Sequence, residues 1–217
     1  MQSRSQAIPG AGPVHAALAD PQWSYVAKAS LEDFRAEDWR VLNAQRAPYY
    51  ASIQADEVLR MLSIGRELPS YGYGVNNYQH CLQSATLAYR SGVDEETVVV
   101  ALLHDIGFIA CPMTHGPFAA ALLSAYVSEE NCWMLERHQV FQLHHLHEYP
   151  GIDRSERDRW RGHPHFAWAA EFVEKFDQNA IDPGYDTAPL EFFVPMVRRL
   201  FERPARAAPS HSNELRP

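Results

Sequence analysis

Six polar side chains fall within or at the ends of otherwise apolar segments of this chain, and all six are of types that bind metal ions. A buried polar group without a partner costs on the order of 1–3 kcal/mol, so six such groups are unfavourable unless they share one. Imidazoles and carboxylates without thiolates are typical ligands of iron, manganese or zinc. Eleven histidines are present, and nine lie between positions 80 and 165. We therefore predict a metal centre formed by His80, His104, Asp105, His115, His138 and Asp177.

The adjacent pair His104-Asp105 is the most informative part of this set. Consecutive residues of an α-helix project about 100° apart, since one turn takes about 3.6 residues. If the helix ends near Gly107, both side chains can reach metal from different directions. A carboxylate has two oxygens, so Asp105 can bind two metal ions at once and serve as the catalytic bridge. The other ligands then form two groups, with His80, His104 and Asp177 on one metal and His115 and His138 on the other.

The order and spacing of these residues resemble the HD-domain superfamily. The run His80-Cys81-Leu82-Gln83-Ser84-Ala85 is followed by Ala101-Leu102-Leu103-His104-Asp105-Ile106-Gly107. Two further histidines and the late run Phe176-Asp177-Gln178-Asn179-Ala180 complete a pattern typical of its binuclear branch. The resemblance covers residues 71–201, and it implies an all-α helical bundle with a dinuclear metal site in its core.

Two activities are known in this superfamily. Many members are phosphohydrolases that use manganese, zinc or another divalent metal. A smaller group, which includes myo-inositol oxygenase and a dioxygenase acting on a hydroxyphosphonate, uses a mixed-valent Fe(II)/Fe(III) pair and O2 to cleave a C–C or C–P bond. Three features resemble the oxygenases. The first is Gln83 in the run that begins at His80, and the second is Phe108, where hydrolases often carry Lys. The third is the interval from His115 to His138 together with the run Phe176-Asp177-Gln178.

The distribution of charge favours the oxygenase interpretation. Hydrolysis of a phosphoester requires cations besides the metals to neutralise developing charge. Between positions 71 and 150 the only Lys or Arg residues are Arg90 and Arg137. We therefore expect a di-iron enzyme that uses O2 on a small hydroxylated metabolite, phosphonates among the candidates. A phosphohydrolase of nucleotides or phosphomonoesters is the alternative, because Arg159 and Arg161 could fold over the site. A degenerate domain that only binds a partner is a third interpretation, against which the complete ligand set argues.

Two positions depart from the phosphonate enzymes that the chain resembles. Tyr73 stands seven residues before His80, where those enzymes have a Glu. Gln142 stands four residues after His138, where a Lys can hold the phosphonate. Both changes argue against a phosphonate substrate. Tyr73 is expected either to gate the site or to pack as a loop aromatic.

Other polar residues near the ligands admit two interpretations each. His145 could line the pocket, or it could belong to a solvated loop. Either His144 or His145 could also replace His138 as the last metal ligand. Gln83 lies one helical turn from His80, so it could contact substrate, support a ligand by hydrogen bonding or simply pack. The residues expected to contact substrate are Tyr73, Gln83, Gln142 and His145.

The elements that must position these residues are expected to be helices. Ser30 is a candidate cap of the first, Pro48 is expected to end it, and Asp94 is a candidate cap of the helix that leads to His104. The run Val98-Val99-Val100 alone would suggest a strand, but the cap and the segment length favour a buried helix. Helices are expected at residues 30–47, 54–68, 76–90, 95–106, 115–127, 129–138, 166–180 and 190–201.

The overall composition limits the remaining possibilities. A net charge of −8 makes nucleic acid or an anionic membrane a poor partner. The three cysteines form no close pair, and the sequence contains neither a signal peptide nor 18 uninterrupted apolar residues. We expect a cytoplasmic enzyme whose partners are a small-molecule substrate and O2, and the sequence leaves its oligomeric state open. The expected organisation is a flexible arm at 1–28, an HD domain at 29–203 and a disordered tail at 204–217.

Overall fold

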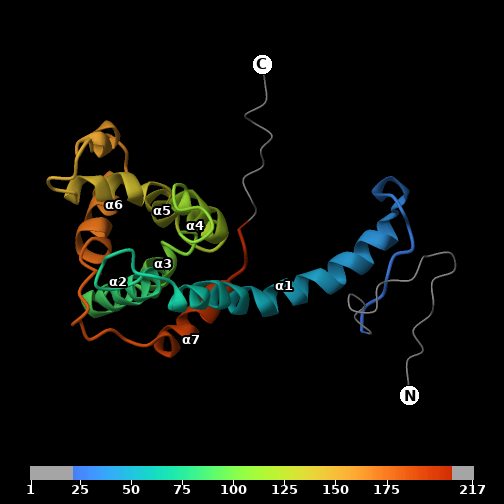
Figure 1. Cartoon of the computed structure of the whole chain (residues 1–217). Helices are drawn as coiled ribbons and strands as arrows, with labels where there is room; N and C mark the ends of the chain where they lie inside the picture. Colours follow the sequence, from blue (N-terminus) through green and yellow to red (C-terminus); the bar gives the residue numbers. More distant parts are fainter. Residues whose placement is uncertain (1–21, 207–217) are drawn as a thin grey trace. The chain divides into compact units, whose positions relative to one another are not determined.

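The computed structural model describes residues 22–206, and the chain divides between Gln54 and Ala55 into two compact units. The predicted arm at 1–28 lies mostly outside the described residues, and so does most of the predicted tail at 204–217. All regular elements of the described residues are helices, which confirms the all-α prediction (Figure 1). None of these helices is both long and apolar enough to span a membrane.

The first long helix, α1, covers Ala36–Ile64 and runs without a break past Pro48. The prediction of two helices separated at this proline is therefore wrong. A proline inside a helix removes the hydrogen bond to the carbonyl four residues earlier, here that of Ala44. Both residues are exposed, so water can take the place of the missing N–H group.

The start of α1 also differs from the expected one. Ser30 caps only a short 3₁₀ turn, Leu31–Asp33, with its hydroxyl accepting from the Glu32 N–H at 3.3 Å. The helix begins later because the Asp38 carboxylate accepts from the Arg35 N–H at 2.6 Å, which satisfies a donor at the helix start.

In the second unit, α2 (Asn77–Ser91) and α3 (Glu95–Leu103) lie side by side. Asn76 caps α2, and Gly92 ends it with a positive φ of 79°. Asp94 caps α3 as predicted, accepting from the Thr97 N–H at 2.7 Å. However, α3 ends three residues before the expected position, so the His104-Asp105 pair lies in the turn that follows.

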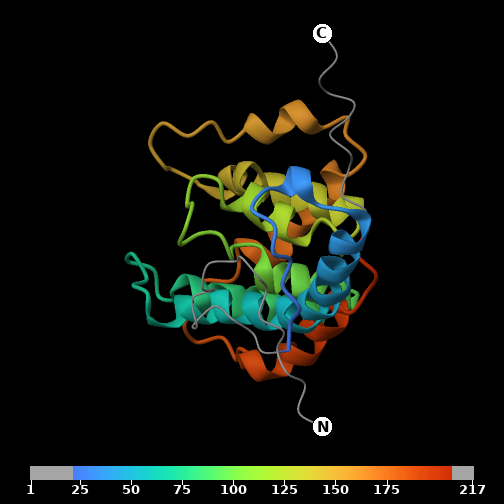
Figure 2. The same ribbon diagram turned by 90° about the vertical axis from the view of Figure 1, so that its right-hand side faces the viewer.

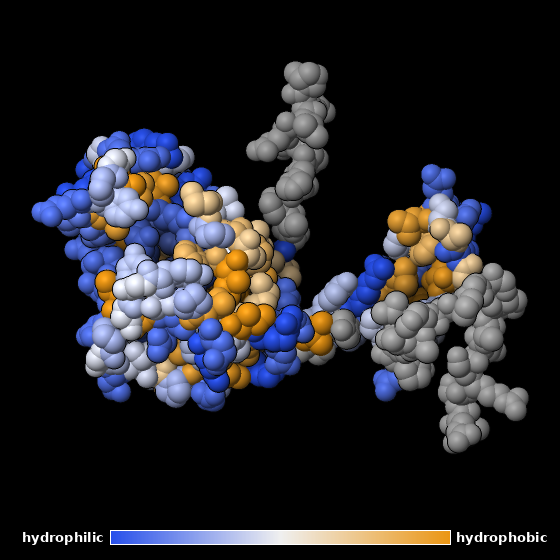
Figure 3. Space-filling view, in the orientation of Figure 1, coloured by the Kyte–Doolittle hydropathy of each residue, from blue (hydrophilic) through white to orange (hydrophobic). Residues whose placement is uncertain are grey.

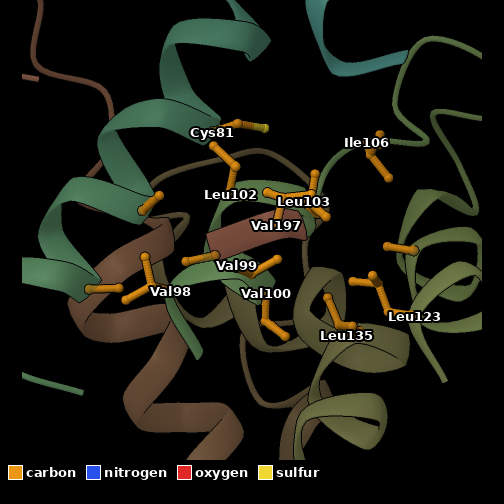
Figure 4. Close-up of a cluster of buried hydrophobic side chains, with 14 of the residues drawn as sticks. Cys81, Val98, Val99, Val100, Leu102, Leu103, Ile106, Leu123, Leu135 and Val197 are labelled. Atoms are coloured by element: carbon orange, nitrogen blue, oxygen red, sulfur yellow. The ribbon is translucent and has the colours of Figure 1, made fainter. Parts of the chain in front are cut away.

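Helix α3 is the centre of the core. Its residues from Thr97 to Leu103 are all buried. Figure 4 shows Val98, Val99 and Val100 among apolar side chains that include Leu135 and Val197. Because neighbouring helices cover every side of α3, a run of valines that resembles a strand is stable as a helix.

Helices α4 (His115–Leu123) and α5 (Glu129–Gln142) pack against each other. The first is four residues shorter than expected. The second continues four residues past the predicted end at His138. Since residues four apart lie on one face of a helix, this extension brings Gln142 onto the same face as His138.

The segment 143–165 joins α5 to α6 (Phe166–Phe172) and lies at the top of Figure 2. It consists of loops and two 3₁₀ helices, Leu143–His145 and Glu156–Trp160. After α6 the chain does not continue as a regular α-helix to residue 180, as expected. It forms a π-helical turn, Val173–Asp177, in which the Gln178 N–H donates to the Val173 carbonyl at 3.0 Å. The last helix, α7 (Leu190–Phe201), has the predicted bounds.

Candidate metal centre

The four predicted histidine ligands share one arrangement of their rings. The Nδ1 atom of each lies within hydrogen-bond distance of a main-chain carbonyl. A carbonyl only accepts, so Nδ1 must carry the proton, and the neutral ring then has a free lone pair on Nε2. The partners are Ala180 for His80 at 3.1 Å, and Ala101, Pro112 and Leu135 for His104, His115 and His138, each at 2.8 Å.

The free ring nitrogens meet in two pairs. His80 Nε2 lies 3.0 Å from His104 Nε2, and His115 Nε2 lies 3.0 Å from His138 Nε2. Two lone pairs at this distance repel each other unless a cation lies between or beside them. One proton shared between the two nitrogens of a pair would relieve this repulsion, and a metal ion that accepts electrons from both nitrogens would relieve it as well. Metal-bound histidines usually hold the other ring N–H on a carbonyl or carboxylate in this way.

Asp105 lies between the two histidine pairs. Its Oδ1 atom is 2.8 Å from His115 Nε2 and 3.2 Å from His138 Nε2, whereas its Oδ2 atom is 3.7 Å from His80 Nε2. Oδ1 also lies 3.7 Å from His104 Nε2. The carboxylate of Asp105 therefore faces ring nitrogens of both pairs. The main chain supports this orientation, because Asn77 Nδ2 donates to the Asp105 carbonyl at 3.2 Å.

The π-helical turn delivers Asp177 to the first histidine pair. Its Oδ1 atom lies 3.5 Å from His80 Nε2 and 3.8 Å from His104 Nε2, and Gln142 Nε2 donates to it at 3.1 Å. Its Oδ2 atom is buried, and no described residue donates to it. A buried carboxylate oxygen without a partner is unfavourable, and a cation at this place would remove the cost.

The structure thus brings all six predicted ligands together from five separate segments. Two groups of three have ligand atoms within 4.8 Å of one another: His80, His104 and Asp177, and His104, Asp105 and His138. The chemistry of the donors, their protonation and the unpaired Asp177 oxygen all fit bound metal ions. His144 is in neither of these groups, and its hydrogen bonds are with Arg154.

Burial and neighbouring charges change the pKa values of several histidines and carboxylates in the cluster. Burial would lower the pKa of His104, but the carboxylates of Asp105 and Asp177 outweigh it and raise this pKa to about 9. The pKa of His80 is lowered by burial and by the charge of His104. Burial alone would raise the pKa of Asp105, yet His104, His115 and His138 hold it well below its usual range. One proton on His104 therefore replaces, in part, the positive charge that metals would supply.

We expect the metal-free protein to lose stability as the pH rises from about 6.5 to about 9. The pKa of His104 is higher in the folded protein (about 9) than its ordinary value of 6.5, so its contribution is complete below 6.5 and disappears as the pH passes 9. The difference corresponds to about 3 kcal/mol at about 1.4 kcal/mol per pKa unit. Urea unfolding of chelator-treated protein at pH 6.5 and 9 measures it. Metal-loaded protein is the control, and a metal-free stability that stayed constant or rose would contradict the expectation.

A pocket of about 170 Å³ opens onto three of the predicted ligands, His80, Asp105 and His115. Aromatic and aliphatic side chains form part of its wall, and uncharged polar side chains form the rest. None of the described lining residues is Lys or Arg. Arg159 and Arg161 do not cover it and instead pair with Glu156 and Asp158. The other lining residues are Ser70, Tyr71, Tyr73, Val75, Asn76, Asn77, Phe108, Gln142 and Ile181.

Some apolar side chains of the second unit remain exposed, and Figure 3 shows them gathered on part of the face that it draws. Ile109 and Met113, between α3 and α4, are 44% and 85% exposed.

Tyr71 and Tyr73 are exposed in a short loop that includes two positive φ angles, 54° at Tyr71 and 101° at Gly72. A positive φ at a tyrosine is a strained conformation, and such strain is common beside functional sites.

Of the four residues expected to contact substrate, the structure places two at the pocket. Tyr73 and Gln142 line it. Gln83 is buried and exchanges two hydrogen bonds with the main chain of Asp182, at 2.9 and 3.1 Å, so it supports the segment after Asp177. His145 does not line the pocket, and its Nε2 is buried without a hydrogen-bond partner among the described residues.

Several lining residues were not predicted. Asn77 lies three residues before His80 on α2, and this spacing, which places both on one helix face, could have identified it. Tyr71 and Ile181 had no such signal, because each belongs to a loop whose course depends on distant contacts.

Gly116 sets the distance between the helices that carry the second histidine pair. A Cβ atom at this position would lie 2.7 Å from the Leu135 carbonyl and 3.2 Å from the His138 ring. We expect Gly116→Ala to reduce stability by about 1–3 kcal/mol and to weaken metal binding at His115 and His138. Denaturant unfolding and metal analysis test this. Gly162→Ala is the control, because no atom lies within 4 Å of its Cβ, and equal behaviour of the two variants would contradict the expectation.

Comparison of the chain with models of known protein families gave no match, and comparison with curated proteins gave none either. The interpretation of the site therefore depends on its geometry and on the sequence pattern.

Proposed function

We propose that this chain is a di-iron oxygenase of the HD-domain type, which uses O2 to cleave a small hydroxylated metabolite. The observation that carries the proposal is the convergence of four Nε2 lone pairs, in two pairs, on the single carboxylate of Asp105. His80, His104, Asp105, His115, His138 and Asp177 would hold two metal ions. An iron pair bound there would supply the activation of O2 and a ligand position for the substrate hydroxyl.

The residues of the chain have three roles in this proposal. The main-chain carbonyls hold each histidine ring in the tautomer and orientation that metal binding needs. Gln142 Nε2 donates to Asp177 Oδ1 at 3.1 Å and so helps to orient this carboxylate. The wall that includes Tyr71, Tyr73 and Phe108 limits the space for water and for large substrates.

The composition of the pocket supports oxygen chemistry over phosphoester hydrolysis. A phosphoryl group in transfer needs cationic side chains or metals at its peripheral oxygens. The described lining residues include no Lys or Arg, and about 170 Å³ is small beside the 300–1,000 Å³ that is typical of pockets for drug-sized ligands. A nucleotide is therefore a poor fit.

Oxygen uptake by the iron-loaded chain is the experiment that tests this function. A panel of small polyols, hydroxy acids, amino alcohols and hydroxyphosphonates is added, and the expected result is stoichiometric O2 consumption with at least one of them. No uptake with any compound would contradict the oxygenase. Turnover of phosphomonoesters or nucleotides by manganese- or zinc-loaded protein, without O2 uptake, would identify the phosphohydrolase instead.

A further inference from the structure

Two aromatic rings on the pocket wall lead from a predicted metal ligand to the surface. The centroid of the Phe108 ring lies 5.4 Å from that of His115, and the Tyr71 centroid lies 6.3 Å from that of Phe108. Exposure increases along this series, since His115 is buried, Phe108 is half-buried and Tyr71 is 70% exposed. The aromatic wall therefore begins beside the predicted metal centre and ends at the pocket mouth.

Further apolar side chains lie at the same mouth. Tyr73 and Ile181 also line the pocket, and they are 63% and 48% exposed. Scattered apolar residues are normal on a protein surface, whereas apolar residues gathered around a pocket are typical of a ligand-binding groove. The exposed rings and the Ile181 side chain would lose contact with water if an apolar group of a ligand covered them, and this burial is favourable.

The backbone holds Tyr71 at the mouth in a strained conformation. Its φ of 54° is unfavourable for a residue with a bulky side chain. Strain of this kind persists where the surrounding structure enforces it, and it is concentrated at ligand-binding sites. The position of the Tyr71 ring next to Phe108 is therefore a second observation, independent of exposure, that points to a ligand at this wall.

The size of the pocket limits the apolar group that it can accept. The pocket has a volume of about 170 Å³. An apolar cavity of about 150 Å³ is sufficient to bind one benzene molecule. A substrate whose hydroxylated head lies at the metals can thus place one ring or a short alkyl chain along Phe108 and Tyr71.

We infer that the substrate carries an apolar group, aromatic or short aliphatic, next to the carbon that bears its hydroxyl, and that Phe108 and Tyr71 bind this group. The inference rests on the proposed function, because in that proposal the metals hold the hydroxylated head. Phe108 contacts the part of the group nearest the metals, and Tyr71 covers its outer end. A polyol is a poor substrate, because its outer hydroxyls would lose water against these rings without gaining new partners.

Three compounds with a common 2-hydroxy acid head test this inference. Mandelate carries a phenyl ring, 2-hydroxybutanoate an ethyl group, and glycerate a hydroxymethyl group that has nearly the same size as ethyl. Calorimetric titration into the metal-loaded full chain without O2 measures binding independently of turnover. Mandelate is expected to bind at least about tenfold more tightly than glycerate, and 2-hydroxybutanoate at least about threefold more tightly.

Tyr71→Asn is the matching variant, because it removes the ring and asparagine adopts a positive φ more readily than most residues. It is expected to reduce the preference for mandelate over glycerate by about fivefold or more. Tyr149→Asn is the control, since Tyr149 is 62% exposed and is not among the residues that line the pocket. This control should leave the preference unchanged.

Each possible failure has a separate meaning. Wild-type protein that holds two metals but binds glycerate as tightly as mandelate, or binds none of the three acids, would overturn this inference and leave the oxygenase standing. An unchanged preference in Tyr71→Asn would overturn the role of the aromatic wall. Protein that prefers mandelate but consumes no O2 with any hydroxylated compound would contradict the proposed function alone.

Discussion

Asp105→Asn is expected to abolish binding of both metal ions and to lower O2 consumption by at least about 100-fold, since the loss of even a residue that supports a metal ligand costs about 10–100-fold. Among the residues that the structure describes, only the carboxylate of Asp105 faces both histidine pairs, at 2.8 Å from His115 and 3.7 Å from His80. An amide keeps the size of the side chain but loses the negative charge and one acceptor. Metal analysis of the purified variant measures the effect, with circular dichroism to establish that it is folded.

Asp186→Asn is the control for this variant, because that carboxylate is exposed and pairs only with Arg90 among the described residues. It should keep its metals. Single replacements His80→Ala and His115→Ala should each weaken one metal more than the other. Retention of two metals per chain by Asp105→Asn would contradict the role of Asp105 as the bridge.

Removal of the metals is expected to lower the melting temperature by roughly 10 °C or more. A ligand that binds only the folded state stabilises it by about 2.7 kcal/mol at 100 times its Kd, so two ions contribute about 5 kcal/mol. Each kcal/mol is worth about 2–4 °C in a chain of this size. The buried, unpaired Asp177 Oδ2 and the two nitrogen pairs at 3.0 Å add to the cost in the metal-free state. Thermal unfolding with and without a chelator measures the shift.

The Asp105→Asn variant supplies the control for this shift. If the metals act through the bridging site, the chelator should change the melting temperature of wild type but not that of the variant. Equal shifts in both proteins would place the stabilising metal elsewhere, and no shift in either would argue against a structural contribution of the site.

The residues of this cluster could be predicted from sequence because of their chemistry. His80 precedes the buried apolar residue Cys81, and Asp177 follows the buried apolar residue Phe176. A polar residue at such a position needs a partner. The cap at Asp94 could also be predicted, since it acts on its own helix end through a short-range hydrogen bond.

What could not be predicted depends on contacts between residues distant in sequence. Gln83 was expected at the substrate, but it bonds to Asp182, 99 residues away. The π-helical turn before Asp177 has no signal in the residues that form it. The passage of α1 through Pro48 depends on solvent exposure, which the local sequence does not specify.

The central claim is that two metal ions are bridged by one carboxylate. Electron paramagnetic resonance of the iron-loaded protein after partial reduction with ascorbate tests this claim most directly. The iron content is measured on the same sample. The account predicts about two irons per chain and the signal of a magnetically coupled Fe(II)/Fe(III) pair, which disappears in Asp105→Asn. Less than one metal per chain, or two irons with only uncoupled signals, would contradict it.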